Sequence, residues 1–141
     1  MFSTLEGVSC RCRPDLMKPF EDGIIIGDLK STTNAAPGPD GFGKSVANFG
    51  YDWQDAFYTD VCTAAELQVM AFVFIAVESS PPYLVSTSVI TDEAREHGRE
   101  QYRQALGTYK RCVESGNWPG YSEAIEMLAL PSWYNFKRRN K

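Results

Sequence analysis

The sequence predicts a single α/β domain in which helices flank a mixed β-sheet. Two short apolar segments, residues 24–26 and 69–77, are rich in β-branched and aromatic residues, which is typical of buried strands. Two longer segments, residues 42–61 and 98–113, repeat apolar residues at helical spacing. A further strand is expected beside each apolar strand, so the predicted order is strand, strand, helix, strand, strand, helix.

Length and composition narrow the possible functions. The 141 residues suffice for one domain, and the 43% hydrophobic and 23% charged fractions are ordinary for a globular protein. No apolar run is long enough for a membrane span and no signal peptide is present, so we expect a cytoplasmic protein without a membrane partner. A net charge of −4 argues against non-specific coating of nucleic acid, but it is compatible with DNA held in a local groove.

The four cysteines are expected to be buried free thiols. Cys10 and Cys12 alternate with polar residues and so share the inward face of one strand, while Cys62 and Cys112 lie far away in the sequence. Their spacing matches neither a zinc site nor an iron–sulfur site, and the single histidine, His97, has no other ligand nearby in the sequence.

The first expected strand covers residues 8–13 and ends beside Asp15. Residues 16–22 contain a proline and run into a Glu-Asp-Gly turn signal at residues 21–23, so we expect them to form a linker. The linker returns the chain into the apolar strand at residues 24–26, and the two strands are expected to be antiparallel neighbours. The sequence does not determine whether this arrangement brings Asp15 beside Asp28.

The central helix is expected to run unbroken from Phe42, with Asp40 as its N-cap. Its apolar stripe predicts a side that faces the core and consists of Phe42, Val46, Phe49, Trp53, Phe57 and Val61.

The second long helix is expected to begin after Thr91 and to stop at Gly116. Its charged side is predicted to be a solvated face and comprises Arg95, Glu96, Arg99, Glu100 and Arg103. A short helix is expected at residues 123–128. We expect the domain to span residues 1–133 and a basic tail to cover residues 134–141.

Asp28 and Lys30 stand at the exit of the first buried strand. Because side chains alternate along a strand, the two point the same way, and we expect Leu29 to point into the core. Charges at the end of a buried strand cost folding energy unless they have a function. The alternative is a surface salt bridge, since Asp-x-Lys alone is a weak signal.

Other polar residues strengthen the functional interpretation. Asp15 supplies a second carboxylate, and Gln54 and Tyr58 lie four residues apart on one face of the central helix. On their own, Gln54 and Tyr58 fit a pair at the core boundary with ordinary hydrogen bonds better than a functional pair. Two carboxylates, a lysine and a helical glutamine together are typical of a divalent-metal site that cuts phosphodiesters.

The order of these motifs resembles the RecE (exonuclease VIII) family, in the RecB-like branch of the PD-(D/E)xK nuclease superfamily. The resemblance extends over nearly the whole chain. Its motifs are Cys10-Arg11-Cys12-Arg13-Pro14-Asp15, Gly27-Asp28-Leu29-Lys30-Ser31-Thr32, Tyr51-Asp52-Trp53-Gln54-Asp55-Ala56-Phe57-Tyr58, Phe72-Val73-Phe74, Pro81-Pro82-Tyr83, the helix from Gly98 to Cys112, Trp118-Pro119 and Leu130-Pro131-Ser132-Trp133.

The resemblance implies a PD-(D/E)xK nuclease-like core and a role for each candidate residue. Asp15, Asp28 and the backbone carbonyl of Leu29 would bind Mg²⁺, with Mn²⁺ as a substitute. Lys30 would be the catalytic lysine, and Gln54 and Tyr58 would form the Gln-x-x-x-Tyr motif of the RecB-like branch.

The implied activity is digestion of duplex DNA from an end, in recombination. The implied partners are DNA, a single-strand annealing recombinase and further copies of the chain in a closed ring. The aromatic residues Trp133, Tyr134 and Phe136 could pack against such a copy or fold back on their own core.

One feature departs from the family pattern. In the family a helical region precedes these strands and supplies an acidic or histidine ligand, whereas residues 1–7 contain only Glu6, which does not match. Either the sequence is a fragment, or a partner completes the site, or one ligand is dispensable. The alternative function is a degenerate nuclease-fold module that binds DNA or a partner protein without cutting.

Overall fold

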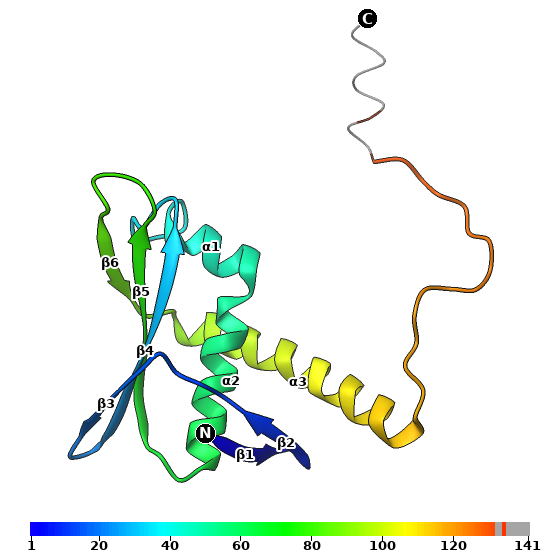
Figure 1. Ribbon diagram of the computed structural model, residues 1–141, viewed down its shortest axis with the longest axis horizontal. Helices are drawn as coiled ribbons and strands as arrows, with labels where there is room; N and C mark the ends of the chain where they lie inside the picture. The colour runs from blue at the N-terminus through cyan, green and yellow to red at the C-terminus, as the bar shows by residue number, and fades with distance from the viewer. Residues whose placement is uncertain (132–133, 135–141) are drawn as a thin grey trace, which may run out of the picture.

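A four-stranded mixed sheet and two long helices form most of the molecule (Figure 1). The computed structural model describes residues 1–131 and residue 134. The expected α/β class and the mixed sheet flanked by helices are confirmed. The expected tail covers residues 134–141, and only Tyr134 of this tail is among the described residues. Trp133 also lies outside the described residues.

The sheet has the strand order β3-β4-β5-β6. Its central strands, β4 (Gly23–Thr32) and β5 (Val69–Glu78), are parallel to one another. The outer strands, β3 (Leu16–Phe20) and β6 (Val85–Ser88), each run antiparallel to the neighbouring central strand. The two central strands are the apolar ones, and their inner face carries the buried residues Ile26, Phe72 and Phe74.

Two corrections concern the first part of the chain. The predicted linker is wrong, because Leu16–Phe20 forms the edge strand β3, where the proline at position 19 needs no partner on its outer side. The strand predicted at residues 8–13 is β2 (Val8–Arg11), and it does not pair with β4. It forms a separate hairpin with β1 (Phe2–Leu5), which has register Phe2↔Arg11 and was not predicted.

One face of the sheet carries the core. Along β4 the buried face includes Ile24, Ile26 and Asp28, and the residues opposite the last two on β5 are Phe72 and Phe74. The expectation that Leu29 points into the core is wrong, because its side chain is 51% exposed on the other face. Strand alternation correctly placed Asp28 and Lys30 together, but the face that they share is the one covered by the helices.

The predicted central helix is divided into α1 (Phe42–Phe49) and α2 (Tyr51–Ala64). Gly50 between them has a φ of 65°, a left-handed conformation that ends α1 and favours glycine. The break turns the apolar stripe, so Phe49 is 69% exposed instead of buried. Asp40 is not the N-cap of α1: Gly41 occupies that position, and Asp40 forms an ion pair with Lys44.

Helix α3 (Asp92–Ser115) begins and ends as expected. The Thr91 hydroxyl accepts a hydrogen bond from the Ala94 N–H over 3.2 Å, and Gly116 adopts the left-handed conformation at the other end. Gly98 lets α3 approach α2 closely, because a Cβ at this position would lie 2.3 Å from the Asp52 carbonyl oxygen. Helix α3 therefore packs directly on α2, as Figure 1 shows.

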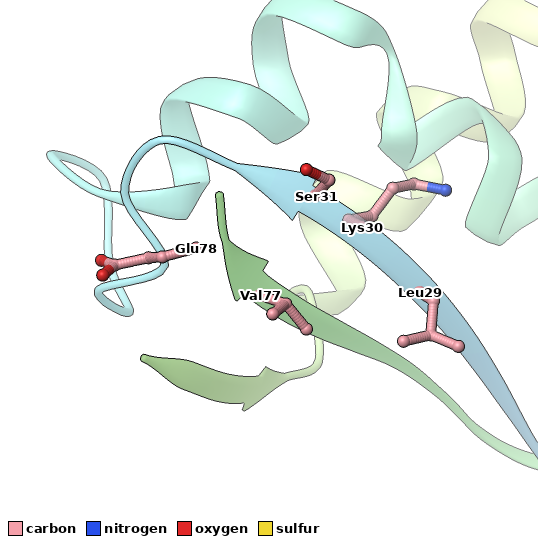
Figure 2. A pocket seen from close by; sticks show the side chains of 5 residues that line it. All are labelled: Leu29, Lys30, Ser31, Val77 and Glu78. Carbon is pink, nitrogen blue, oxygen red and sulfur yellow. The ribbon is translucent and has the colours of Figure 1, made fainter. Parts of the chain in front are cut away.

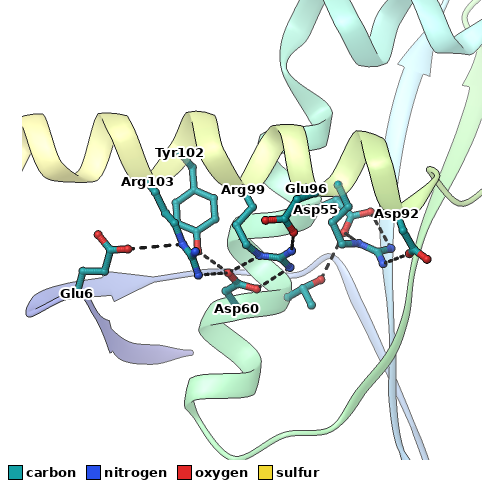
Figure 3. Close-up of polar contacts among 10 residues, drawn as sticks. Glu6, Asp55, Asp60, Asp92, Glu96, Arg99, Tyr102 and Arg103 are labelled. Carbon is teal, nitrogen blue, oxygen red and sulfur yellow. Dashed lines mark hydrogen bonds and ion pairs between the residues drawn. The ribbon is translucent and has the colours of Figure 1, made fainter.

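The charged side of α3 is not a simple solvated face. Figure 3 shows its arginines reaching carboxylates on α2. Arg95 Nε donates to Asp55 Oδ1 over 2.7 Å, and Arg99 Nε donates to Asp60 Oδ2 over 2.9 Å. Burial raises the pKa of Asp55, against the hydrogen bond from Arg95. Burial also acts on Asp60, but hydrogen bonds from Arg99 and Tyr102 outweigh it and lower the pKa of that carboxyl.

The last described segment, residues 116–131, contains no helix, so the short helix predicted at residues 123–128 is wrong. The side chains of Tyr121, Ile125 and Met127 are fully exposed, so no core contact supports a helix in this segment. No helix among the described residues is long and apolar enough to cross a membrane.

The cysteines are buried free thiols, as expected. Cys12 directly follows β2 and Cys62 lies on α2, and their Sγ atoms are 3.9 Å apart. Burial raises the pKa of Cys62 to about 12, so this thiol remains protonated at neutral pH and packs as a small apolar group.

Candidate active site

Asp28 and Lys30 project from β4 toward the helices. They continue the face that buries Ile24 and Ile26, so the apolar part of the strand leads directly into a charged pair. Asp28 is 2% exposed, and its Oδ2 atom forms an ion pair with Lys30 Nζ. Oδ2 has no well-directed hydrogen bond, so the pair is an electrostatic contact at the edge of the core.

Gln54 closes a triangle with these two residues. Its Nε2 donates to Asp28 Oδ1 over 2.6 Å, and its Oε1 accepts from Lys30 Nζ over 2.9 Å. The side-chain amide thus offers its donor to the carboxylate and its acceptor to the ammonium group. Gln54 lies in the first turn of α2, so the start of this helix after Gly50 determines where the amide points.

Asp15 lies at the same end of the sheet. It immediately precedes β3, whose register with β4 begins at the pair Leu16↔Gly27. One step further along this antiparallel pair brings Asp15 beside β4, where its Oδ2 accepts a hydrogen bond from the Leu29 N–H over 2.9 Å. The structure therefore brings Asp15, Asp28, Leu29, Lys30 and Gln54 together.

Tyr58 is not part of this polar cluster. It lies one turn after Gln54, but its ring packs against Phe57 and Phe72, each with a centroid distance of 6.3 Å. Within the described part of the chain, no hydrogen bond joins Tyr58 to Asp28, Lys30 or Gln54. Its surroundings are those of a partly buried core residue, and a catalytic role for Tyr58 stays a prediction.

Tyr51 belongs to the site although the sequence did not single it out. Lys30 Nζ lies 4.6 Å from the centroid of the Tyr51 ring, within the range of a cation–π contact. The ring is held by Phe42, Phe49 and Phe74, with centroid distances of 6.1, 5.7 and 6.1 Å. Its sequence signal is an aromatic residue at the first position of a helix, three residues before the glutamine.

A shallow hollow of about 340 Å³ lies along β4 and β5 near the site. Figure 2 shows its lining, in which the side chains of Leu29 and Val77 point away from that of Lys30. Lys30 contributes to the hollow from the strand, but its ammonium group extends toward the helices. The hollow therefore lies on the outer face of the sheet, and the polar cluster lies on the inner face.

Comparisons with known proteins identify the family and the fold. Residues 1–131 match the family described as the PDDEXK-like domain of unknown function, DUF3799. The chain belongs to the DUF3799 family. No curated protein matches its sequence.

The fold of this DUF3799 chain is similar to a crystal structure described as a "Putative exonuclease" from Eubacterium rectale, with a TM-score of 0.69 and 17% identity. The similarity covers 96% of this chain and 54% of the other, so the chain spans about half the length of that protein. At this identity the comparison shows the shared fold. The chain has a nuclease fold of the PDDEXK type.

The donor atoms of this DUF3799 site fit a hard divalent cation. Asp15 and Asp28 offer carboxylate oxygens at neighbouring strand positions, and Mg²⁺ is typically bound by one or two carboxylates together with waters and substrate phosphates. Among residues 1–131 and 134, no group of three or more His, Cys, Asp or Glu could hold a metal ion, so the protein carboxylates at this site are Asp15 and Asp28 alone. His97 lies elsewhere and pairs with Asp52 over 3.1 Å.

Proposed function

We propose that this chain is a metal-dependent deoxyribonuclease that hydrolyses DNA phosphodiester bonds, with Mg²⁺ as its metal and Mn²⁺ as a substitute. The observation that carries the proposal is the closed set of contacts among Asp28, Lys30 and Gln54, at a buried position beside Asp15. A carboxylate that is 2% exposed and paired with a lysine is costly to bury, and the nuclease fold supplies a function for it.

Asp15, Asp28 and the Leu29 carbonyl would hold the metal. The bound metal would supply an activated water and neutralise charge on the phosphate. Lys30 would donate to a phosphate oxygen, where negative charge grows in the transition state. Gln54 would keep Lys30 and Asp28 in fixed relative positions through its two hydrogen bonds, at 2.9 and 2.6 Å.

A finer proposal is a RecE-like exonuclease that acts on the ends of duplex DNA in recombination. It is supported by the sequence resemblance and by the similar fold of the protein described as a "Putative exonuclease". The same resemblance supports a closed homo-oligomeric ring that threads DNA and a single-strand annealing recombinase as a partner. Light scattering that gives a monomer at high protein concentration would remove the ring.

The test of the proposal uses linear, nicked and closed-circular duplexes of one sequence, each incubated with and without Mg²⁺. We expect linear DNA to be degraded only when Mg²⁺ is present, and closed-circular DNA to remain intact. The Lys30→Ala protein should degrade neither the linear nor the closed-circular DNA. Cleavage of the closed circle would indicate an endonuclease. Binding of every DNA without cleavage would instead support a degenerate module, in which the ion pair between Lys30 and Asp28 persists.

A further inference from the structure

Phe49 is an exposed aromatic residue joined to the candidate active site by ring contacts. It is the last residue of α1, and its side chain is 69% exposed. One face of the ring stacks on Tyr51, with centroids 5.7 Å apart and an interplanar angle of 30°. Tyr51 lies in turn 4.6 Å from Lys30 Nζ. Two contacts therefore connect Phe49 to the lysine that we propose to act on phosphate.

The surface around Phe49 suits a nucleotide. A hollow of about 260 Å³ beside the ring is lined by hydroxyl-bearing side chains, namely Ser31, Thr32, Thr33, Ser45 and Ser79. Hydroxyl groups of this kind commonly contact the phosphates and sugars of DNA. Phe49 also lines a second hollow, of about 310 Å³, together with Asn48, Gly50 and the partly exposed Trp53. The ring thus borders space on the surface that a planar group can enter.

The net charge of this chain contributes little to its affinity for DNA. Its net charge is −4, so long-range attraction of phosphates contributes less than in a basic DNA-binding protein. Stacking of a base on an aromatic ring is independent of net charge and tolerates any sequence, because every base has a π-face. An exposed aromatic ring beside the site can therefore contribute to DNA binding without positive charge.

We propose that the ring of Phe49 is a stacking platform for an unpaired nucleobase next to the scissile phosphate. The inference rests on the proposed nuclease function and specifies the form of DNA that the site accepts, a frayed or single-stranded end. The contacts that link Phe49 to Lys30 Nζ through Tyr51 measure 5.7 and 4.6 Å, so this base would lie within the first few nucleotides from the phosphate at Lys30.

The experiment pairs a change in the protein with a change in the DNA. Binding is measured by fluorescence anisotropy in EDTA, so that cleavage does not intervene. The probe is a forked duplex with unpaired ends, prepared intact and with a single abasic site at each of the first four unpaired positions. The proteins are the unmodified chain, Phe49→Ala, Phe49→Trp and Phe2→Ala. Phe2 is a matched control, because it is 70% exposed but lies on β1, beside Arg11.

We expect one abasic position to weaken binding by the unmodified chain about 5- to 100-fold, the range for one stacked base. For Phe49→Ala, an abasic site at that position should weaken binding by about 2-fold or less, because this variant already lacks the ring on which the base stacks. Phe49→Trp and Phe2→Ala should behave like the unmodified chain.

Equal sensitivity of the unmodified chain and Phe49→Ala at all four positions would overturn the stacking site, as would affinity too weak to measure with intact DNA. Because the measurement needs no cleavage, its failure is distinct from failure of the proposed nuclease activity. A chain that degrades linear DNA in Mg²⁺ but shows equal sensitivity is a nuclease without this platform.

Discussion

Gln54 donates its side-chain N–H to Asp28 Oδ1 over 2.6 Å, although the two residues are 26 positions apart in the chain. The contact joins the first turn of α2 to the buried face of β4. With the hydrogen bond from Lys30, it fixes three polar side chains in one arrangement before any substrate binds. Such preorganisation is what electrostatic catalysis requires, because donors need not reorient during the reaction.

Gln54→Ala should slow DNA cleavage by about 10- to 100-fold, the usual cost of removing a group that orients metal-binding residues. The fold should persist, because the substitution leaves the apolar core intact. Steady-state cleavage assays and circular dichroism measure the two effects. Gln104→Ala, which alters an exposed glutamine of α3, serves as the control and should cleave normally. Equal rates for the two variants would contradict a role for the amide.

Lys30→Ala should slow cleavage by at least about 100-fold, because under the proposed function Lys30 donates to the charge that develops on the phosphate. DNA affinity should fall far less, since one phosphate contact among several is a modest loss. Single-turnover cleavage and equilibrium binding separate the two quantities. The control is Lys44→Ala, which removes an exposed lysine whose ion pair with Asp40 spans 3.4 Å. A Lys30→Ala protein that cuts at the normal rate would make Lys30 a structural residue.

Asp28→Asn and Asp15→Asn should each weaken Mg²⁺ and Mn²⁺ binding, because each removes one carboxylate from the proposed ligand set. Isothermal titration calorimetry in the absence of DNA measures the affinity. Asp40→Asn is the matched control, since its side chain is 98% exposed and lies outside the site. Unchanged affinity in both site variants would exclude these carboxylates as the metal ligands.

Tyr51→Leu should slow cleavage by about 3- to 30-fold, which corresponds to the loss of a cation–π contact with Lys30. Tyr51→Phe keeps the ring and should retain most of the activity, whereas a role for the hydroxyl would make both variants slow. Thermal unfolding of both proteins shows how much of any loss comes from core packing. A Tyr51→Leu protein with normal kcat would show that the ring does not position Lys30.

Asp60→Asn should lower the free energy of unfolding by about 2 kcal/mol at pH 7, because hydrogen bonds from Arg99 and Tyr102 to a carboxylate are weakened. The pKa of Asp60 is lower in the folded protein than the ordinary value of 3.8. Its stabilising contribution is therefore complete above about pH 4 and is lost as the pH falls through the folded-state pKa.

Urea unfolding of Asp60→Asn and of the unmodified chain, measured from pH 7 to pH 3, tests this dependence. The difference between the two proteins should shrink only at the acidic end. Glu96→Gln is the control, because its side chain is 57% exposed and an ion pair of this kind contributes about 1 kcal/mol or less. A difference that does not vary with pH would assign the effect of Asp60→Asn to packing.

Several elements follow from local sequence alone. The apolar composition of β4 and β5 predicts buried strands, because short runs of β-branched and aromatic residues are typical of strands packed in a core. The hydroxyl of Thr91 and the glycine at position 116 mark the ends of α3, since capping involves only near neighbours. Strand alternation likewise places Asp28 and Lys30 on one face.

The rest was decided by contacts between distant segments. Alternation shows which residues share a face but not which face the helices cover, so Leu29 was expected inside and lies outside. The choice of β3 as the partner of β4 is a non-local pairing, and this pairing delivers Asp15 to the Leu29 N–H. The turn at Gly50 aims α2 so that Gln54 reaches Asp28 and Lys30. The sequence by itself determined the polar residues and their local elements, whereas packing of the helices on the sheet decided which of them meet, because the free energy of that packing depends on all the segments together.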